Sequence, residues 1–220
     1  MWTKEVVDMI LKGIQETLYM TLLSTLMGYV IGLPMGVLLA VSDKEGLKPN
    51  RVLYRILDVI ANIVRSIPFL ILLILLIPFT RLVVGKSYGS TATVVPLVIA
   101  AGPFIARMVE SSLKEVPAGV IEAALSMGAK TGTIVRKVLI GEARTSLLVG
   151  GTIVLGTVLG YSAMAGVIGG GGLGKIAINY GYYRYKYLVM FAAVILLILL
   201  VQLFQTVGTK LAVKCDKRLK

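Results

Sequence analysis

Long uncharged stretches separated by short clusters of charge dominate the sequence. Four of these stretches cover residues 18–41, 87–106, 145–174 and 187–209. A helix needs about 20 consecutive apolar residues to cross the ~30 Å hydrocarbon core of a bilayer. Each stretch therefore predicts one transmembrane helix.

A fifth stretch, residues 66–80, is shorter. At about 1.5 Å per residue it makes a helix of roughly 22 Å, which is too short to span a bilayer alone. It becomes long enough if it takes in part of 56–64 or of 82–84. We count it as a fifth span.

The sequence thus predicts one all-α integral membrane domain over residues 1–220 with about five transmembrane helices. A loop over about 115–143 should join the third span to the fourth. The expected spans cover approximately 16–41, 58–84, 88–112, 144–167 and 187–210.

The distribution of lysine and arginine predicts the orientation of these spans. With the N-terminus outside, the inner loops and the C-terminal tail, with Lys217, Arg218 and Lys220, hold 14 basic residues, and the outer loops hold seven. Positive charge accumulates on the cytoplasmic side of membrane proteins. We therefore expect the N-terminus outside, the C-terminus in the cytoplasm and the 115–143 loop on the cytoplasmic face.

Composition supports a membrane protein and argues against several other classes. The chain is 57% hydrophobic, has a mean hydropathy of +0.88 and carries a formal net charge of +12. The sequence has no soluble basic domain that could bind nucleic acid. We therefore interpret the positive charge as a sign of how the spans are oriented in the membrane. The sequence has no histidine and one cysteine, Cys215, and shows no paired carboxylates or nucleophile with a base. We expect no catalytic residue, bound cofactor, metal site or nucleic-acid partner.

Small residues recur at helical spacing in two spans. Gly28, Gly32 and Gly36 follow one another at four-residue intervals in the first span, and Gly156 and Gly160 repeat the interval in the fourth. Such spacing lets helix backbones approach closely in lipid. The stripes are equally compatible with packing inside one subunit and with an interface between subunits.

The 115–143 loop contains a short apolar helix bounded by helix breakers. Pro117 and Gly119 interrupt the chain arriving from the third span, good helix formers occupy 120–127, and Gly128 should end the helix. This helix has more apolar surface than contact with water favours. Its partner is either the lipid headgroup layer or a cleft on another protein.

Residues 122–128 read Glu-Ala-Ala, three residues, then Gly. This segment resembles the coupling-loop motif of the membrane subunits of ATP-binding-cassette importers. In that family nine further residues separate the glycine from an aliphatic residue, a spacer, a second aliphatic residue and a proline. Val138 and Ile140 match the aliphatic positions, whereas Gly141 stands where the proline is expected.

Longer segments resemble one branch of that family, the methionine-uptake permeases. The similar segments are Arg-Ser-Ile-Pro-Phe at 65–69, Ile-Pro-Phe-Thr-Arg at 77–81, Pro-Phe-Ile-Ala-Arg-Met-Val-Glu at 103–110, Gly-Tyr-Ser-Ala-Met at 160–164 and Gly-Gly-Leu-Gly at 171–174. The resemblance extends over most of the chain and implies a permease subunit that imports methionine, as one or both enantiomers.

The resemblance also implies roles for particular residues. The helix that docks on the ATPase would comprise Glu122, Ala123, Ala124, Leu125, Met127 and Gly128. The translocation pathway or gate would involve Tyr161, Ser162, Met164, Pro68 and Phe69. Arg107 and Glu110, three residues apart on one helix face, are expected to form a structural ion pair.

The partners that the resemblance implies form a complete importer. They are a second copy of the chain, two cytoplasmic ATP-binding-cassette ATPase subunits, an extracytoplasmic substrate-binding lipoprotein and membrane lipid. ATP and Mg²⁺ would bind to the partner ATPase and not to this chain. The location would be the cytoplasmic (inner) membrane of a bacterium, in which the chain is a multi-pass protein.

Three other functions remain compatible with the sequence. The same type of importer could carry another amino acid or small polar solute. An ion-coupled secondary transporter or channel would need titratable residues in mid-membrane, and the uncharged stretches hold essentially none. A membrane enzyme or assembly factor would need a reactive cluster near the interface, which the sequence does not show.

The run Gly-Gly-Gly-Gly-Leu-Gly-Lys at 169–175 fits the spacing of a phosphate-binding loop. That loop needs a Ser or Thr after the lysine to hold magnesium, and here Ile176 follows. The run also comes after a membrane span and on the expected outer side. We expect a closely packed outer turn and not a nucleotide site.

Overall fold

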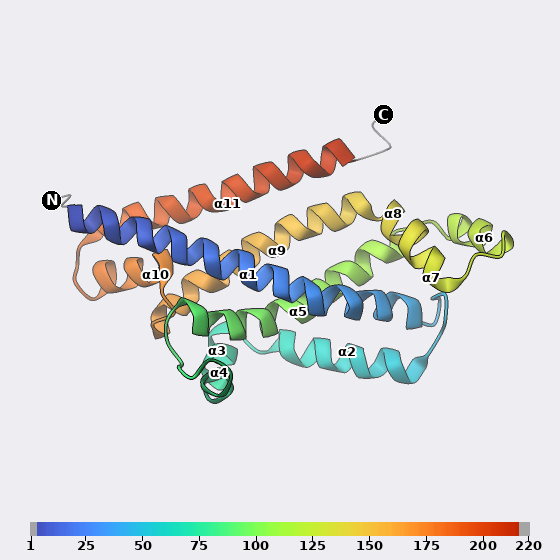
Figure 1. Ribbon diagram of the computed structural model, residues 1–220, viewed down its shortest axis with the longest axis horizontal. Coiled ribbons are helices and arrows are strands. Elements are labelled where there is room, and N and C mark those ends of the chain that lie inside the picture. The colour runs from blue at the N-terminus through green and yellow to red at the C-terminus, as the bar shows by residue number, and fades with distance from the viewer. Residues whose placement is uncertain (1–3, 216–220) are drawn as a thin grey trace.

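The computed structural model describes residues 4–215, and every regular element in that range is a helix. Four long helices run along the long axis of the molecule: α1 (Lys4–Ser42), α5 (Ser90–Lys114), α9 (Arg144–Ala165) and α11 (Tyr187–Cys215) (Figure 1). The prediction of an all-α fold is confirmed. Lys217, Arg218 and Lys220, which entered the charge count, lie outside the described residues.

The four long helices are also the ones long and apolar enough to cross a membrane. A fifth crossing comes from α2 (Arg51–Ser66) and α3 (Phe69–Leu75), if this pair, bent by 101°, counts as one span. The structure thus has four to five candidate spans, in agreement with the expected number.

The second span differs in form from the single helix expected over 58–84. The chain makes α2, α3 and then α4 (Ile77–Val84). Pro68 causes the sharp bend, since proline lacks an N–H and disfavours helical geometry in the preceding residue. Ile67 accordingly has an extended backbone, with φ −83° and ψ 123°. The break lies next to α5 and α9.

Close contact between α1 and α5 forms the centre of the bundle. A Cβ added to Gly32 would lie 2.5 Å from the carbonyl oxygen of Gly102, and one on Gly36 would lie 2.6 Å from Cβ of Val109. The first glycine stripe therefore serves packing inside the subunit. The second stripe does not, because a Cβ on Gly156 or Gly160 would meet nothing within 4 Å.

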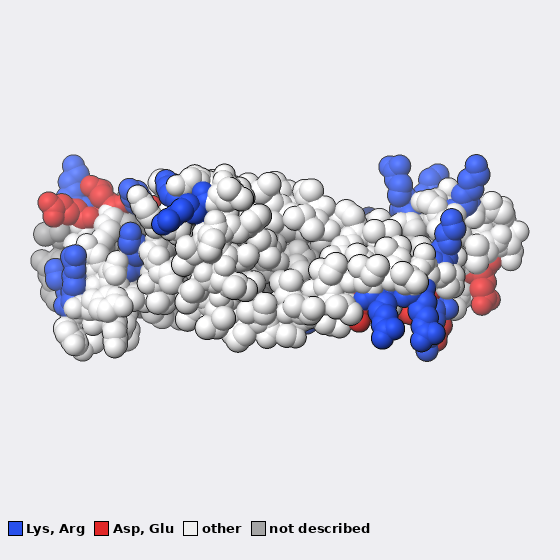
Figure 2. Space-filling view, turned by 90° about the horizontal axis from the view of Figure 1, so that it is seen from below, with Lys and Arg blue, Asp and Glu red and all other residues white. Residues whose placement is uncertain are grey.

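Charged side chains gather at the two ends of the molecule and leave an uncharged belt between them (Figure 2). One end carries the start of α1 and α10 (Gly172–Ile176). The other carries α6 (Ala118–Ser126), α7 (Thr131–Thr133) and the end of α11 (Figure 1). The belt has the apolar surface that a bilayer requires. Which end faces the cytoplasm stays a prediction from the distribution of charge.

The contact between α1 and α5 predicts that Gly32 cannot carry a large side chain. Gly32→Leu should lower the free energy of unfolding by about 3 kcal/mol, because the added atoms collide with backbone that cannot move aside. Gly132→Leu is the control, because a Cβ there would meet nothing within 4 Å, and should change it by less than ~0.5 kcal/mol. Thermal unfolding of the purified protein in detergent measures both, and equal midpoints for the two variants would contradict this packing.

Candidate functional site

Helix α6 stands at one end of the molecule, between two breaks in the chain (Figure 1). It begins directly after Pro117, whose φ of −59° and ψ of 134° turn the chain away from α5. Proline suits this position, because the first residues of a helix leave their N–H groups without partners in any case. The helix is nine residues long, so it is a short separate element and not a continuation of α5.

Gly128 ends α6 in the way the sequence indicates. Its φ of +74° is left-handed, a conformation that glycine adopts without strain. The N–H of Gly128 donates to the carbonyl of Leu125 at 2.9 Å, and that of Ala129 donates to the carbonyl of Ala124 at 3.1 Å. These two bonds form a Schellman motif, which satisfies the last carbonyls of the helix and directs the chain sharply back.

The outward face of α6 is apolar. Met127 is 81% exposed, and Val120 and Leu125 are also exposed. Ala124 points inward and is only 5% exposed. Of the six residues expected to dock, Ala124 thus anchors the helix to its own chain, and the other five lie on the surface: Glu122, Ala123, Leu125, Met127 and Gly128.

The inward face of α6 belongs to the same apolar core as the membrane spans. The π-helix η1 (Ile134–Leu139) lies beneath α6 and buries Ile134 and Leu139. These side chains form one cluster with Ala124 and with Val116 at the end of α5. The cluster continues into the spans through Leu113 and Val109 on α5 and Val154 and Val158 on α9. A displacement of α6 must therefore move side chains that are packed against the transmembrane helices.

Gly141, which replaces the proline expected from the resemblance, lies in the short helix α8 (Ile140–Glu142). A Cβ at this position would meet nothing within 4 Å, and its φ is not left-handed. The local backbone thus does not require glycine, and helical geometry continues here without a proline.

Three of the five residues expected in the pathway come together at the bend of the second span. The rings of Phe69 and Tyr161 stack with centroids 4.3 Å apart and planes 6° apart, and Pro68 precedes Phe69 at the start of α3. Beside this stack is a cavity of about 170 Å³, which Arg65 and Phe104 also line. The bend thus creates a small cavity with aromatic walls and one guanidinium group.

The other two residues lie apart from this cavity. Ser162 is 1% exposed, and its hydroxyl donates to the carbonyl of Leu159 at 2.7 Å, so it faces the interior of the bundle. Met164 is 51% exposed on the outside of the subunit. A surface position for Met164 is compatible with a contact to another subunit.

Arg107 and Glu110 do form an ion pair, with 2.7 Å between Arg107 Nη1 and Glu110 Oε2. The pair is part of a larger network that ties α2 to α5. Arg107 also forms an ion pair with Asp58, and its Nη2 donates to Asn62 Oδ1 at 2.9 Å. The sequence missed these partners because Asp58 and Asn62 fell within an expected span, although their four-residue spacing on one helix face is a signal.

Lys114 extends the network to the end of α1. Its Nζ lies 2.8 Å from Glu110 Oε1 and 2.5 Å from Asp43 Oδ2. The hydrogen bond from Lys114 lowers the pKa of the Asp43 carboxyl below its usual range. The network therefore braces the end of α1, α2 and α5, and the acids Asp58 and Glu110 are both paired with cations.

The glycine-rich run at 169–175 is occupied by the chain itself. The N–H of Gly172 donates to Glu16 Oε2 at 2.7 Å, and that of Leu173 donates to Thr17 Oγ1 at 2.9 Å. A carboxylate from α1 thus takes the position at the start of α10 that a phosphate would need. Residues 169–175 therefore form a closely packed turn, as expected, and do not have the arrangement of a phosphate-binding loop.

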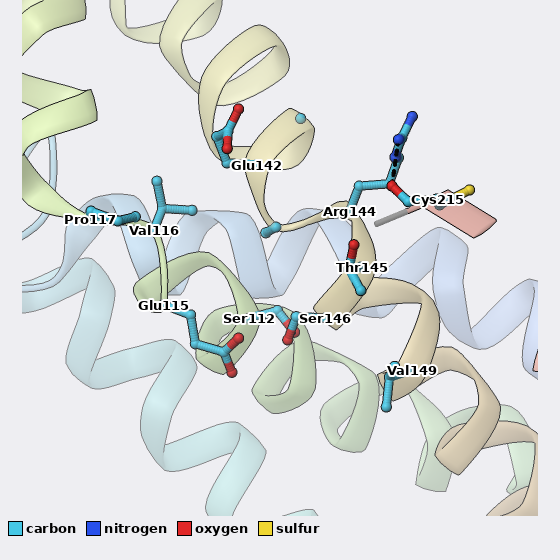
Figure 3. Close-up of a pocket in the computed structure, with 12 residues that line it drawn as sticks. Ser112, Glu115, Val116, Pro117, Glu142, Arg144, Thr145, Ser146, Val149 and Cys215 are labelled. Atoms are coloured by element: carbon cyan, nitrogen blue, oxygen red, sulfur yellow. Dashed lines mark hydrogen bonds between the residues drawn. The ribbon is translucent and has the colours of Figure 1, made fainter. Parts of the chain in front are cut away.

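A second cavity of about 360 Å³ lies between the end of α5, α8 and the start of α9. Figure 3 shows Glu115 and Glu142 on its walls and Arg144 reaching the end of α11, where Nη2 donates to the carbonyl of Cys215 at 2.7 Å. Ser146 donates to Ser112 at 2.9 Å across the base. No group of three potential metal ligands occurs within residues 4–215.

Comparison with known proteins gives one family. The model of the family described as "Binding-protein-dependent transport system inner membrane component" matches residues 32–212. A Vibrio cholerae protein named "Probable D-methionine transport system permease protein MetI" is 48% identical over 96% of this chain and 94% of its own. The D-methionine permease MetI of Escherichia coli is 51% identical over 72% of this chain and 73% of its own.

Solved structures agree with the sequence relatives. A chain from an inward-facing structure of the MetNI methionine ABC transporter has a TM-score of 0.96 and 48% identity, over 98% of this chain and 100% of that one. A chain from an amino acid ABC transporter crystallised with histidines has a TM-score of 0.73 at 24% identity, over 97% of this chain and 95% of that one, which shows a shared fold.

The ion-pair network predicts unequal effects for its two cations. Arg107→Ala should lower the free energy of unfolding by about 3 kcal/mol, since Arg107 is only 18% exposed and its loss leaves Asp58 without its cation and the buried Glu110 with Lys114 alone. Lys114→Ala should cost about 1 kcal/mol or less, because its side chain is 43% exposed. Denaturation of the two purified variants tests this order, and a larger loss for Lys114→Ala would contradict it.

Proposed function

The chain belongs to the family of binding-protein-dependent transport system inner membrane components, and from that premise we propose that it forms the pathway through which an ATP-driven importer carries methionine, both enantiomers included. As a permease subunit of an ATP-binding-cassette importer, it is a multi-pass protein of the bacterial cytoplasmic membrane and is not an enzyme. ATP and Mg²⁺ bind to a separate ATPase subunit.

The observation that carries the choice of methionine is similarity along nearly the whole chain. Relatives named as D-methionine permeases are 48% and 46% identical over 96% and 98% of this chain. A second amino acid or small polar solute is the alternative cargo, because a binding protein performs much of the selection in such importers. The extracytoplasmic lipoprotein that delivers the solute would dock at the end of the molecule carrying α10.

The part of the chain that receives force from the ATPase is α6. An exposed apolar helix of this length suits a groove on another protein, where packing gives affinity. Glu122 lies in the middle of the helix, beyond its first turn, and is exposed, so its carboxylate would meet a basic residue of the ATPase. The buried cluster beneath α6 would transmit the movement to α5 and α9.

A second copy of the chain would complete the pathway. The exposed face of α9 carries Gly156, Gly160 and Met164, and a Cβ on either glycine would meet nothing within 4 Å of this subunit. Small residues on an open helix face permit a second helix to approach closely. The solute would then pass between two such faces, near the stacked rings of Phe69 and Tyr161.

Transport of labelled methionine tests the proposed cargo. Vesicles that hold this subunit together with its co-encoded ATPase and binding protein should accumulate L- and D-methionine when ATP is supplied in the lumen. The lumen corresponds to the cytoplasm in this assay. An ATPase variant without hydrolytic activity serves as the control and should abolish the uptake. ATP-dependent uptake of a different amino acid, with none of methionine, would refute the cargo while leaving the importer intact.

A substitution at the left-handed turn of Gly128 tests whether α6 docks on the ATPase. Gly128→Val should weaken assembly with the ATPase and transport by roughly fivefold to thirtyfold, because a branched residue at positive φ costs about 1–2 kcal/mol. Gly132→Val in the same loop is the control, since Gly132 has no positive φ and no neighbour within 4 Å of an added Cβ. Co-purification of the ATPase measures assembly, and normal assembly and transport in Gly128→Val would refute the role.

A further inference from the structure

A third hollow lies on the side of the bundle, between α1, α9 and α11. It has a volume of about 510 Å³, and its walls are almost entirely apolar. In Figure 1, α1 and α11 diverge toward the end that carries α6, with α9 between them. The lining side chains include Tyr29 of α1, Leu148 and Leu155 of α9 and Leu211 of α11.

Two arginines stand at one mouth of this groove. Arg136 comes from η1, and Arg144 is the first residue of α9. Arg144 uses one nitrogen to donate to the carbonyl of Cys215, which ties its side chain to the end of α11 and leaves its other donors available. Among residues 4–215, no carboxylate lines the groove, and the charged side chains on its walls are both positive.

The length of the groove corresponds to one leaflet of a bilayer. From Arg144 to Leu155 is 11 residues along α9, which is roughly 16 Å at 1.5 Å per residue. Half of a ~30 Å hydrocarbon core is about 15 Å. The arginines therefore lie at headgroup level when the apolar walls face the acyl region of the same leaflet.

From this geometry we propose that the groove binds an anionic phospholipid. Its acyl chain lies along Leu148, Leu155 and Leu211, and its phosphate takes hydrogen bonds from Arg136 and Arg144. Basic pockets between transmembrane helices recognise anionic headgroups in this way, and guanidinium groups are well suited to phosphate oxygens. The inference does not depend on which solute is carried.

Other occupants fit the groove less well. The chain beyond residue 215 carries Asp216 against Lys217, Arg218 and Lys220, so its net charge has the same sign as the mouth. A second copy that presented the same patch across a two-fold axis would bring its own Arg136 and Arg144 close to these two. A lipid phosphate brings a net negative charge, which neither alternative does.

Native mass spectrometry of the purified transporter complex tests the site. With phosphatidylglycerol and phosphatidylcholine of equal chain length, the parent protein should retain phosphatidylglycerol preferentially. The double variant R136Q/R144Q should bind it more weakly by roughly fivefold for each arginine lost. The variant K130Q/K137Q removes the same charge from the same loop outside the groove and should keep the preference.

A second pair of variants tests the apolar part of the groove. Leu211→Trp should fill it and remove both lipids, whereas Leu203→Trp, on an exposed turn of α11 outside the groove, should not. Equal phosphatidylglycerol binding by R136Q/R144Q and the parent would overturn the proposal, as would an equal loss in K130Q/K137Q. Absence of any retained lipid in the parent would also overturn it and would indicate that another subunit covers the groove.

Discussion

Continuous burial of apolar side chains from the middle of the spans into the loop that carries α6 is the constraint on which the rest of the structure depends. Val109 and Leu113 on α5 lead to Val116, and from there to Ala124 in α6 and Ile134 in η1, all within one cluster. Close-packed interiors transmit displacement and do not absorb it. A helix that would otherwise be an exposed appendage is thus mechanically part of the bundle.

Two further constraints hold the bundle in shape. The glycines of α1 bring its backbone against α5, so these two helices behave as one unit. The paired charges of Asp58, Arg107 and Glu110 attach α2 to the same unit, close to the C-terminal end of α5. Between these fixed parts, the bend at Pro68 produces the cavity beside Phe69 and Tyr161. The rigid elements therefore surround the place where the proposed pathway runs.

Local sequence signals predicted much of this arrangement. The lengths of the uncharged stretches predicted the long helices, and the helix breakers at Pro117 and Gly128 predicted α6. Both signals depend on residues that are close together in the chain. Contacts between distant residues were not predictable in the same way. The partnership of Arg107 with Asp58 and the filling of the glycine-rich turn by Glu16 depend on how α2 and α1 pack. The inward orientation of Ser162 likewise depends on how α9 is rotated about its axis. The predicted bounds of a span do not show which face of its helix points inward.

The claim that α6 contacts the ATPase is tested most directly by chemical capture. A thiol-linked photocrosslinker would be attached at Met127→Cys, in a Cys215→Ser background, within the assembled transporter. We expect this probe to capture the ATPase subunit, and the same probe at Tyr187→Cys, at the opposite end of the molecule, not to capture it. Capture of lipid alone from Met127→Cys in an intact transporter would contradict it.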